Sequence, residues 1–136
     1  MRDSKAFRRS LRRIMKAWAA PIGCGLLFLF LLRFIFFVGY VPSASMEPAI
    51  KEGSFIWGVR TFGKLARGDI IIFKHGSALL VKRIAGVPGD TVIADGQSMI
   101  VPPDCYFVLG DNAEQSLDSR SWADPFIAAD SIVAKL

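Results

Sequence analysis

The feature that most constrains this chain is an apolar run near its N-terminus. Residues 22–38 are apolar apart from Arg33, with Trp18 before the run and Tyr40 after it. As a helix, residues 18–40 would be about 33 Å long at 1.5 Å per residue, which matches a bilayer hydrocarbon core of roughly 30 Å. Aromatic residues at both ends suit the two membrane interfaces. The run therefore predicts one transmembrane helix over residues 18–40.

Basic residues are concentrated at the start of the chain. Residues 1–40 carry a net charge of +7 and residues 41–136 a net charge of −2, which make up the formal +5 of the 136-residue chain. The positive-inside rule places a basic segment, residues 1–17, in the cytoplasm and the domain beyond the membrane. A cleavable signal peptide is the competing interpretation, but the run is longer than a typical signal-peptide core. We therefore expect an uncleaved anchor in a phospholipid membrane, and no nucleic-acid partner for the mildly acidic remainder.

After residue 48 the apolar pattern changes to short β-type runs separated by Gly, Pro and Asp. These runs are residues 55–60, 70–74, 79–84, 91–93, 99–101, 106–109 and 132–134. No stretch in this part keeps helical periodicity over a dozen residues. The sequence therefore predicts a single N-terminal transmembrane helix followed by an all-β domain over residues 41–136, mainly an antiparallel coiled sheet.

Cysteine and histidine are scarce. Cys24 lies in the apolar run and Cys105 in the β region, so we expect no disulfide between them and find no metal-ligand spacing around them. His75 is the single histidine, and we interpret it as a strand-end or turn residue rather than a catalytic base. The prediction therefore includes no metal and no other cofactor.

Two serines directly follow the predicted membrane helix. Ser43 and Ser45 lie between Pro42 and Pro48. Because proline biases the residue before it towards an extended conformation, we expect both serines on a stiff, non-helical segment. Such a segment suits a nucleophile, but Pro and Ser are also common in linkers that leave a membrane.

A lysine interrupts an apolar strand further along the chain. Lys82 lies in the run L-L-V-K-R-I at residues 79–84, and polar residues are dense at 109–120. Burial disfavours the charged form of an amine, so a pKa lowered towards about 7 or 8 would make Lys82 a general base at neutral pH. A lysine whose amine reaches solvent along its stem is the alternative. With no histidine pair, a serine activated by lysine is the simplest chemistry that these residues offer.

Four segments carry a resemblance to a known family. They are P-S-A-S-M-E-P (42–48), R-G-D-I-I-I-F (67–73), V-K-R-I-A-G-V-P-G-D (81–90) and L-G-D-N-A-E-Q-S-L-D-S-R-S-W (109–122). In order and spacing these segments resemble the conserved boxes of type I signal peptidases, which are membrane-anchored Ser/Lys proteases. The resemblance covers nearly all of residues 38–136, and the four boxes together are highly specific although each alone is a weak signal.

The resemblance implies a role for each matching residue. Ser45 would be the nucleophile, and Lys82 the general base that also activates water for deacylation. Ser43, together with the backbone N–H of Ser45, would form the oxyanion hole. An orienting hydroxyl on the lysine would replace the acid of a Ser/His/Asp triad. The supporting residues that the resemblance implies are Ser116, which orients the lysine, the ion pair of Asp118 and Arg120, and the turn of Gly110, Asp111 and Asn112.

The resemblance also implies a substrate. Such enzymes bind an extended peptide of a secretory preprotein by β-addition, with small side chains at positions −1 and −3 before the cleaved bond. The expected substrate-binding residues are Val41, Pro42, Leu80 and Val81. The function so implied is the removal of N-terminal signal peptides from translocated preproteins. The enzyme would be a single-pass protein of the cell membrane with an extracytoplasmic catalytic domain.

The chain departs from the family pattern in places. Residues 113–115 are A-E-Q where R-D-N is usual, Ala49 replaces a common threonine, and Ala123 replaces the usual glycine. None of these changes removes a catalytic group, but the sequence alone does not predict how the 113–115 turn packs. The insertion that larger members carry between the lysine box and the last box is nearly absent, with only about ten residues at 91–100, and this resembles the compact, single-span members of the family.

Two alternatives stay open. One is a specialised peptidase of the same family that serves a single substrate, such as a conjugative pilin or a particular surface protein. The other is a non-catalytic, membrane-anchored β domain that uses the fold for binding. The intact set of Ser45, Lys82 and Ser116 argues against the second alternative.

Overall fold

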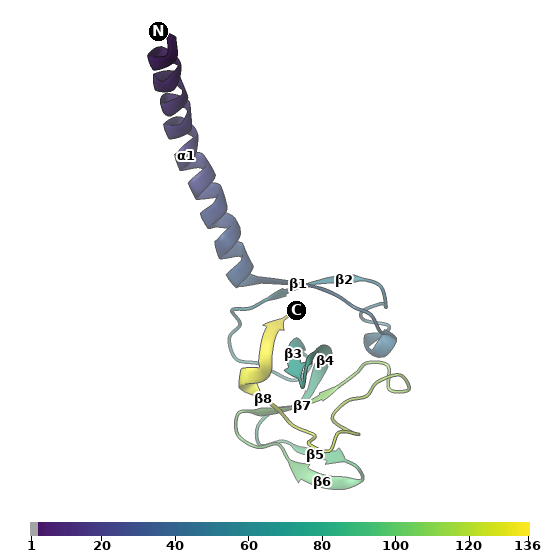
Figure 1. The fold of residues 1–136 in the computed structure, drawn as a ribbon. Coiled ribbons are helices and arrows are strands. Elements are labelled where there is room, and N and C mark those ends of the chain that lie inside the picture. The colour runs from purple at the N-terminus through teal and green to yellow at the C-terminus, as the bar shows by residue number, and fades with distance from the viewer. Residues whose placement is uncertain (1–2) are drawn as a thin grey trace. The chain divides into compact units, whose positions relative to one another are not determined.

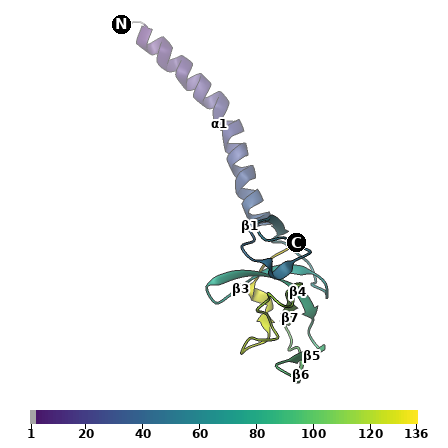
Figure 2. The same cartoon turned by 90° about the vertical axis from the view of Figure 1, so that its right-hand side faces the viewer.

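The computed structural model describes residues 3–136, and the side chains from residue 13 onward. The chain divides into two compact units, Met1–Ile35 and Phe36–Leu136. Figures 1 and 2 show the chain as a ribbon. In chain order the elements are α1 (Asp3–Ile35), β1 (Phe36–Tyr40), η1 (Ala44–Met46), β2 (Phe55–Val59), β3 (Ile70–His75), β4 (Ala78–Gly86), β5 (Thr91–Ala94), β6 (Gln97–Ile100), β7 (Cys105–Leu109), β8 (Ile127–Ala128), η2 (Ala129–Ser131) and β9 (Ile132–Lys135).

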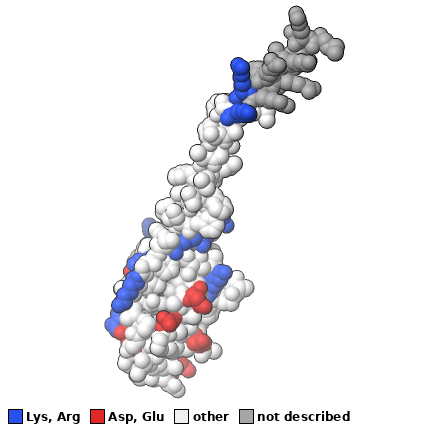
Figure 3. Space-filling view, turned by 90° about the vertical axis from the view of Figure 1, so that its left-hand side faces the viewer, with Lys and Arg blue, Asp and Glu red and all other residues white. Residues whose placement is uncertain are grey.

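The first unit is the single helix α1. Its stretch Arg13–Ile35 is long and apolar enough to cross a membrane, and none of it is buried. Between Lys16 and Arg33 the helix carries no charged residue, and this part is white in Figure 3. In the predicted basic segment, the side chains up to residue 12 lie outside the described residues.

The predicted helix end at Tyr40 is wrong. α1 ends at Ile35, and Phe36–Tyr40 forms β1, which pairs antiparallel with β2 from Phe36↔Val59 to Tyr40↔Phe55. The run F-F-V-G-Y is apolar enough to look like more of the helix. Aromatic and β-branched residues also favour strands, and a neighbouring strand with a matching pattern decides between the two.

The second unit is built on an antiparallel sheet. Seven strands follow the order β1-β2-β9-β3-β4-β7-β8, and β5 and β6 form a separate hairpin. Every pairing among the described strands is antiparallel. Within this unit the β1–β2 and β5–β6 hairpins lie at opposite ends (Figures 1 and 2). The predicted fold class, one apolar helix followed by a mainly antiparallel β domain, is confirmed, and all seven predicted runs are strands.

Two apolar clusters support the segments that carry polar residues. One lies under the 41–50 segment and consists of Val41, Met46, Ile50, Ile56, Ile72 and Ala134. The other lies between β3, β4 and β7 and consists of Leu65, Ile71, Phe73, Ile84, Val108, Ile127 and Ile132. Side chains alternate along β4, so that Lys82 shares its face with the buried Ile84. The fold thus brings the serine segment and the lysine strand onto one well-packed support.

Candidate active site

The serine segment leaves β1 in a defined direction. The backbone N–H of Val41 donates to the carbonyl of Ser54 at 3.0 Å, and the carbonyl of Val41 accepts from the N–H of Gly53 at 2.8 Å. These bonds continue the β1–β2 pairing by one residue. Ser43 is then extended, with φ −140° and ψ 152°. The segment therefore enters the site as a continuation of a strand.

Ser45 has a different backbone from the one we predicted. Ala44–Met46 forms a single turn of 3-10 helix, so the expected extended conformation is correct for Ser43 and wrong for Ser45. The prolines restrict only the residue before each of them, which leaves the residues between free to turn. Met46 holds the turn in place because its side chain is buried, with 1% exposed, in the cluster beneath it.

The hydroxyl of Ser45 lies at the edge of this support. Ser45 is 8% exposed, and its Oγ accepts a hydrogen bond from Ser43 Oγ at 3.4 Å. That distance is at the long end for an O–H···O bond, so the contact is weak. Among the side chains that the structure describes, this is the only hydrogen bond of the Ser45 hydroxyl. The hydroxyl therefore keeps its freedom to rotate.

Lys82 is a buried amine with a defined partner. The residue is 3% exposed, and its Nζ donates to Ser116 Oγ at 2.9 Å. Burial lowers the pKa of Lys82 below that of an ordinary lysine, the carboxylate of Asp118 raises it in opposition, and the guanidinium of Arg120 lowers it further. The neutral form of this amine is therefore more accessible than that of an ordinary exposed lysine.

Asp118 is the best-connected side chain near the lysine. It is fully buried and accepts five hydrogen bonds: two from the Arg120 guanidinium, one each from the N–H groups of Gly110 and Arg120, and one from Ser116 Oγ. Burial raises the pKa of Asp118, but the bonds from Arg120, Gly110 and Ser116 outweigh burial and hold the pKa to about 2. Asp118 with these partners is called the Asp118 cluster below.

The proton arrangement at Ser116 follows from its two partners. Ser116 Oγ donates to Asp118 Oδ2 at 2.7 Å and accepts from Lys82 Nζ at 2.9 Å. A hydroxyl has one proton to give, and an ionised carboxylate can only accept. The amine must therefore donate to Ser116, which leaves the lone pair of a neutral amine pointing elsewhere.

The turn after β7 joins the serine segment to the lysine strand. Asp111 forms a two-bond ion pair with Arg83, the residue next to Lys82, at 2.8 and 2.6 Å. The backbone N–H of Asn112 donates to the carbonyl of Ser45 at 3.0 Å. The predicted Asp111 and Asn112 thus make contacts that fix β4 and the Ser45 turn relative to each other.

Gly110 is the tightest point of this turn. A Cβ on Gly110 would lie 2.6 Å from the carbonyl oxygen of Ser45 and would also collide with Ser116. Only glycine lets the backbone pass between these two residues. The departing residues 113–115 are exposed, so the absence of the usual side chains there leaves no gap in the core.

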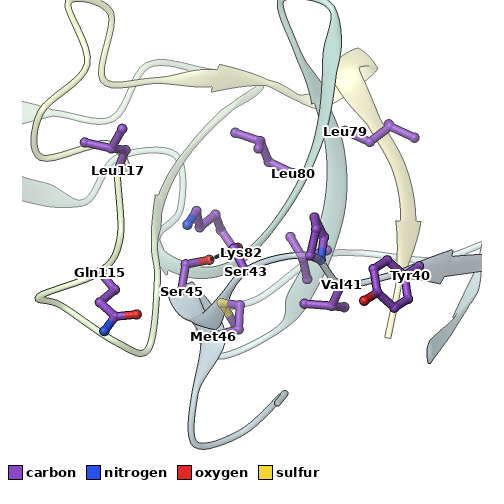
Figure 4. Close-up of a pocket in the computed structure, with 12 residues that line it drawn as sticks. Tyr40, Val41, Ser43, Ser45, Met46, Leu79, Leu80, Lys82, Gln115 and Leu117 are labelled. Carbon is purple, nitrogen blue, oxygen red and sulfur yellow. Dashed lines mark hydrogen bonds between the residues drawn. The ribbon is translucent and has the colours of Figure 1, made fainter. Parts of the chain in front are cut away.

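Ser45 and Lys82 line one pocket of about 280 Å³. Figure 4 shows both side chains pointing into it, Lys82 from β4 and Ser45 from the turn. The four residues predicted to bind substrate, Val41, Pro42, Leu80 and Val81, all line it. Within the described residues, no hydrogen bond joins the Ser45 hydroxyl to the Lys82 amine.

Other residues of the site were missed from the sequence. Met46, Gln115 and Leu117 also line the pocket. Ser119 is fully buried, and it exchanges hydrogen bonds with the backbone of Val108 that tie the Asp118 cluster to β7. The only sequence signal for Ser119 is its place between Asp118 and Arg120.

His75 lies apart from this chemistry. It ends β3, as predicted, and its ring stacks on that of Trp122 with the ring centres 4.1 Å apart. His75 does not line the pocket. The aromatic pair packs the end of the β3–β4 hairpin against the segment that follows Arg120.

Comparisons with known proteins agree with this geometry. The family model of signal peptidase, peptidase S26, matches residues 14–101 and 93–136. The chain is 29% identical to signal peptidase I P of Bacillus subtilis subsp. natto over 160 residues, covering 89% of this chain and 85% of that protein. It is 30% identical to signal peptidase I T of Bacillus subtilis strain 168 over 155 residues, covering 85% and 80%.

A third relative, signal peptidase I S of Bacillus subtilis strain 168, is 28% identical over 150 residues, covering 82% of each chain. The family model spans both the serine segment and the loop that carries Ser116 and Asp118. The chain belongs to the signal peptidase family, peptidase S26, and is a hydrolase of the signal peptidase I type.

Proposed function

We propose that this protein is a membrane-anchored serine endopeptidase that removes N-terminal signal peptides from translocated preproteins. Ser45 acts as the nucleophile and Lys82 as the general base. The observation that carries the proposal is the buried Lys82 amine, held by Ser116 at 2.9 Å in the same pocket as Ser45. Membership of the signal peptidase family supports the substrate class.

Acylation uses the neutral amine. Lys82 Nζ accepts the hydroxyl proton of Ser45 while Ser45 Oγ bonds to the carbonyl carbon of the substrate. The tetrahedral intermediate then collapses, the C–N bond breaks, and the proton passes from Lys82 to the leaving amine. The amine keeps one N–H on Ser116, so its lone pair is available for Ser45. Substrate binding closes the distance between the two groups, as is common for catalytic hydrogen bonds that are long in free enzymes.

Two donors stabilise the negative charge that develops on the substrate oxygen. These are the hydroxyl of Ser43 and the backbone N–H of Ser45. A donor aimed at this oxygen is worth about 3 to 4 kcal/mol of barrier lowering. Ser43 is exposed and already contacts Ser45 Oγ, so its hydroxyl has room to turn to the oxyanion. In deacylation, Lys82 Nζ takes a proton from water while the water oxygen bonds to the acyl carbon. The ester C–O bond then breaks, the new carboxyl end leaves, and Ser45 Oγ takes the proton back from Lys82.

Free strand edges beside the pocket suit an extended peptide. β7 pairs with β4 only from Arg83 to Gly86, so within the described residues the part of β4 before Lys82 has β3 on one side and an open edge on the other. β1 is an end strand of the sheet. A peptide added along these edges meets Val41, Pro42, Leu80 and Val81, whose apolar walls suit small side chains at −1 and −3.

The apolar face of β1 and β2 supports a site at the membrane surface. Three cross-strand pairs lie on one face: Phe36 with Val59, Val38 with Trp57, and Tyr40 with Phe55. All six side chains are between 38% and 71% exposed. A contiguous patch of exposed apolar side chains is suited to an interaction site, and aromatic residues suit the headgroup region of a bilayer.

The topology follows from the charges. The basic residues at the start of the chain stay in the cytoplasm, and Phe36–Leu136 lies on the extracytoplasmic side. Protease added to intact spheroplasts should digest this domain, while a tag fused before residue 1 should be protected. Protection of the domain in the intact spheroplasts would refute the orientation.

A cleavage assay tests the proposed function. The full-length protein in detergent is incubated with a secretory precursor, and the mature N-terminus is identified by mass spectrometry. We expect the wild type to release the mature protein, and Ser45→Ala and Lys82→Ala to leave the precursor intact. Equal cleavage by both variants and the wild type would sink the mechanism.

A further inference from the structure

The pocket extends beyond Ser45 and Lys82, which are called the reactive pair below. Gln115 and Leu117 line it together with the residues of β1 and β4. In Figure 4, Gln115 and Leu117 lie on one side of Ser45 and Lys82, while Val41, Tyr40 and Leu79 lie on the other. The reactive pair therefore divides the pocket into two walls. The wall formed by Gln115 and Leu117, here called the loop wall, has no role in the mechanism above.

Leu117 is placed unusually for a leucine. Its side chain is 77% exposed, yet the next residue, Asp118, is fully buried, and the preceding Ser116 bonds to Lys82. Both neighbours turn inward to the Asp118 cluster, which turns Leu117 outward over the pocket. An apolar side chain displayed on a fixed support is suited to contact with a ligand.

Hydrogen bonds fix the backbone of the loop wall on both sides of Leu117. The five bonds to Asp118 fix the backbone on one side of Leu117. On the other side, the N–H of Gln115 donates to the carbonyl of Asn112 at 3.2 Å and closes the turn. The loop wall is thus held in place before any substrate arrives.

The direction of the substrate follows from where the proton must go. The leaving amine takes its proton from Lys82 Nζ, and that atom donates a hydrogen bond to Ser116 Oγ. The polypeptide that begins with the leaving amine must therefore start beside Ser116. Gln115 and Leu117 flank Ser116 in the chain and line the same pocket.

We propose that the loop wall binds the first residues of the released mature polypeptide, with Leu117 favouring an apolar side chain at the first or second position after the cleaved bond. The amide of Gln115 is neutral and can pair with the peptide backbone there. This inference rests on the proposed function, because it takes the direction of the peptide from the acyl transfer to Ser45.

The test measures kcat/KM for a panel of peptides that differ only after the cleaved bond, with Leu or Ser at the first position and, separately, at the second. The full-length protein in detergent is used as wild type and as Leu117→Ser. We expect the wild type to prefer Leu over Ser about fivefold at one of the two positions, as partial burial of a leucine predicts. In Leu117→Ser this ratio should fall to about one.

Two matched variants give the controls. Ile93 is a similarly exposed apolar residue, at 69%, in the β5–β6 hairpin, and it does not line the pocket, so Ile93→Ser should leave every ratio unchanged. Leu79 lies on the opposite wall (Figure 4). Leu79→Ser should alter selectivity before the cleaved bond and keep the Leu/Ser ratio after it.

The outcomes separate this inference from the proposed function. If the wild type cleaves the peptides of the panel and Ser45→Ala does not, that result supports the proposed function by itself. If that holds, an unchanged Leu/Ser ratio in Leu117→Ser overturns the inference alone. An equal loss on all peptides also overturns it, because Leu117 would then act on the fold of the loop. No cleavage of any peptide by the wild type would overturn both.

Discussion

The two sides of the reactive pair are held in different ways. On one side, Lys82 is fixed through Ser116 to the Asp118 cluster, where a single carboxylate accepts five hydrogen bonds. On the other side, the hydroxyl of Ser45 has one weak contact, at 3.4 Å from Ser43. The proposed base, Lys82, is therefore oriented in advance, whereas the proposed nucleophile, Ser45, can still turn. We infer that changes on the lysine side disturb both rate and stability, and changes on the serine side disturb rate alone.

The largest effect is expected for Lys82 itself. Lys82→Arg keeps a long basic side chain, but its guanidinium stays protonated at every working pH and cannot accept the Ser45 proton. We expect kcat to fall by at least about 10⁴-fold, as for other dyad or triad members. Single-turnover cleavage of a precursor measures this, and substantial activity in Lys82→Arg would show that the amine is no base.

On the serine side, Ser43→Ala should cost rate without cost to the fold. Removing one oxyanion donor lowers kcat by about 10² to 10³-fold. Ser43 is exposed, so the thermal unfolding temperature should stay unchanged. A normal kcat in Ser43→Ala would show that Ser43 is not part of the oxyanion hole. A large drop in unfolding temperature would show that the serine side also carries stability.

The turn that joins the two sides gives the next test. Gly110→Ala forces Ser116 or the Ser45 carbonyl to move, because the new Cβ has no space. A displacement of about 1 Å in a catalytic group can cost about 10²-fold in rate. Gly63→Ala is the matched control, since nothing lies within 4 Å of a Cβ there. Equal kcat values for the two variants would contradict the close approach at Gly110.

The smallest effect is expected for Asp118→Asn, and it concerns the free energy of unfolding. Its pKa is about 2 in the folded protein against an ordinary 3.8, so ionised Asp118 contributes stability that is present above pH 3.8 and is lost as the pH falls through 2. The shift corresponds to about 2 kcal/mol. Urea unfolding in detergent should show Asp118→Asn less stable than the wild type at pH 7, with the gap closing towards pH 2. A gap that does not depend on pH would contradict this linkage.

The sequence predicted the β domain well because its strands are short, apolar and separated by turn residues. It failed at β1, because F-F-V-G-Y continues the apolar helix in composition, and only its pairing with β2 makes it a strand. The 3-10 turn at Ser45 could not be predicted either, since it depends on the burial of Met46 in the core. Both the β1–β2 pairing and the burial of Met46 are contacts between distant segments, which local sequence rules do not describe.

The site was predictable in its parts and less so in its assembly. A lysine in an apolar strand indicated an amine with a lowered pKa, and the structure gives that pKa the same direction. The contact of Lys82 with Ser116 spans 34 residues, and only the family resemblance pointed to it. Gly110 was expected as part of a turn, but the lack of space for a Cβ depends on two segments that are distant in sequence.

The central claim is that Lys82 acts as a neutral amine on Ser45, and the pH dependence of kcat/KM tests it most directly. Because burial lowers the pKa of Lys82, the active neutral amine should appear at a lower pH than an ordinary lysine would allow. The account predicts that kcat/KM rises about tenfold per pH unit on the acidic side and then levels off. A flat profile from about pH 5 to 9 would contradict an amine base.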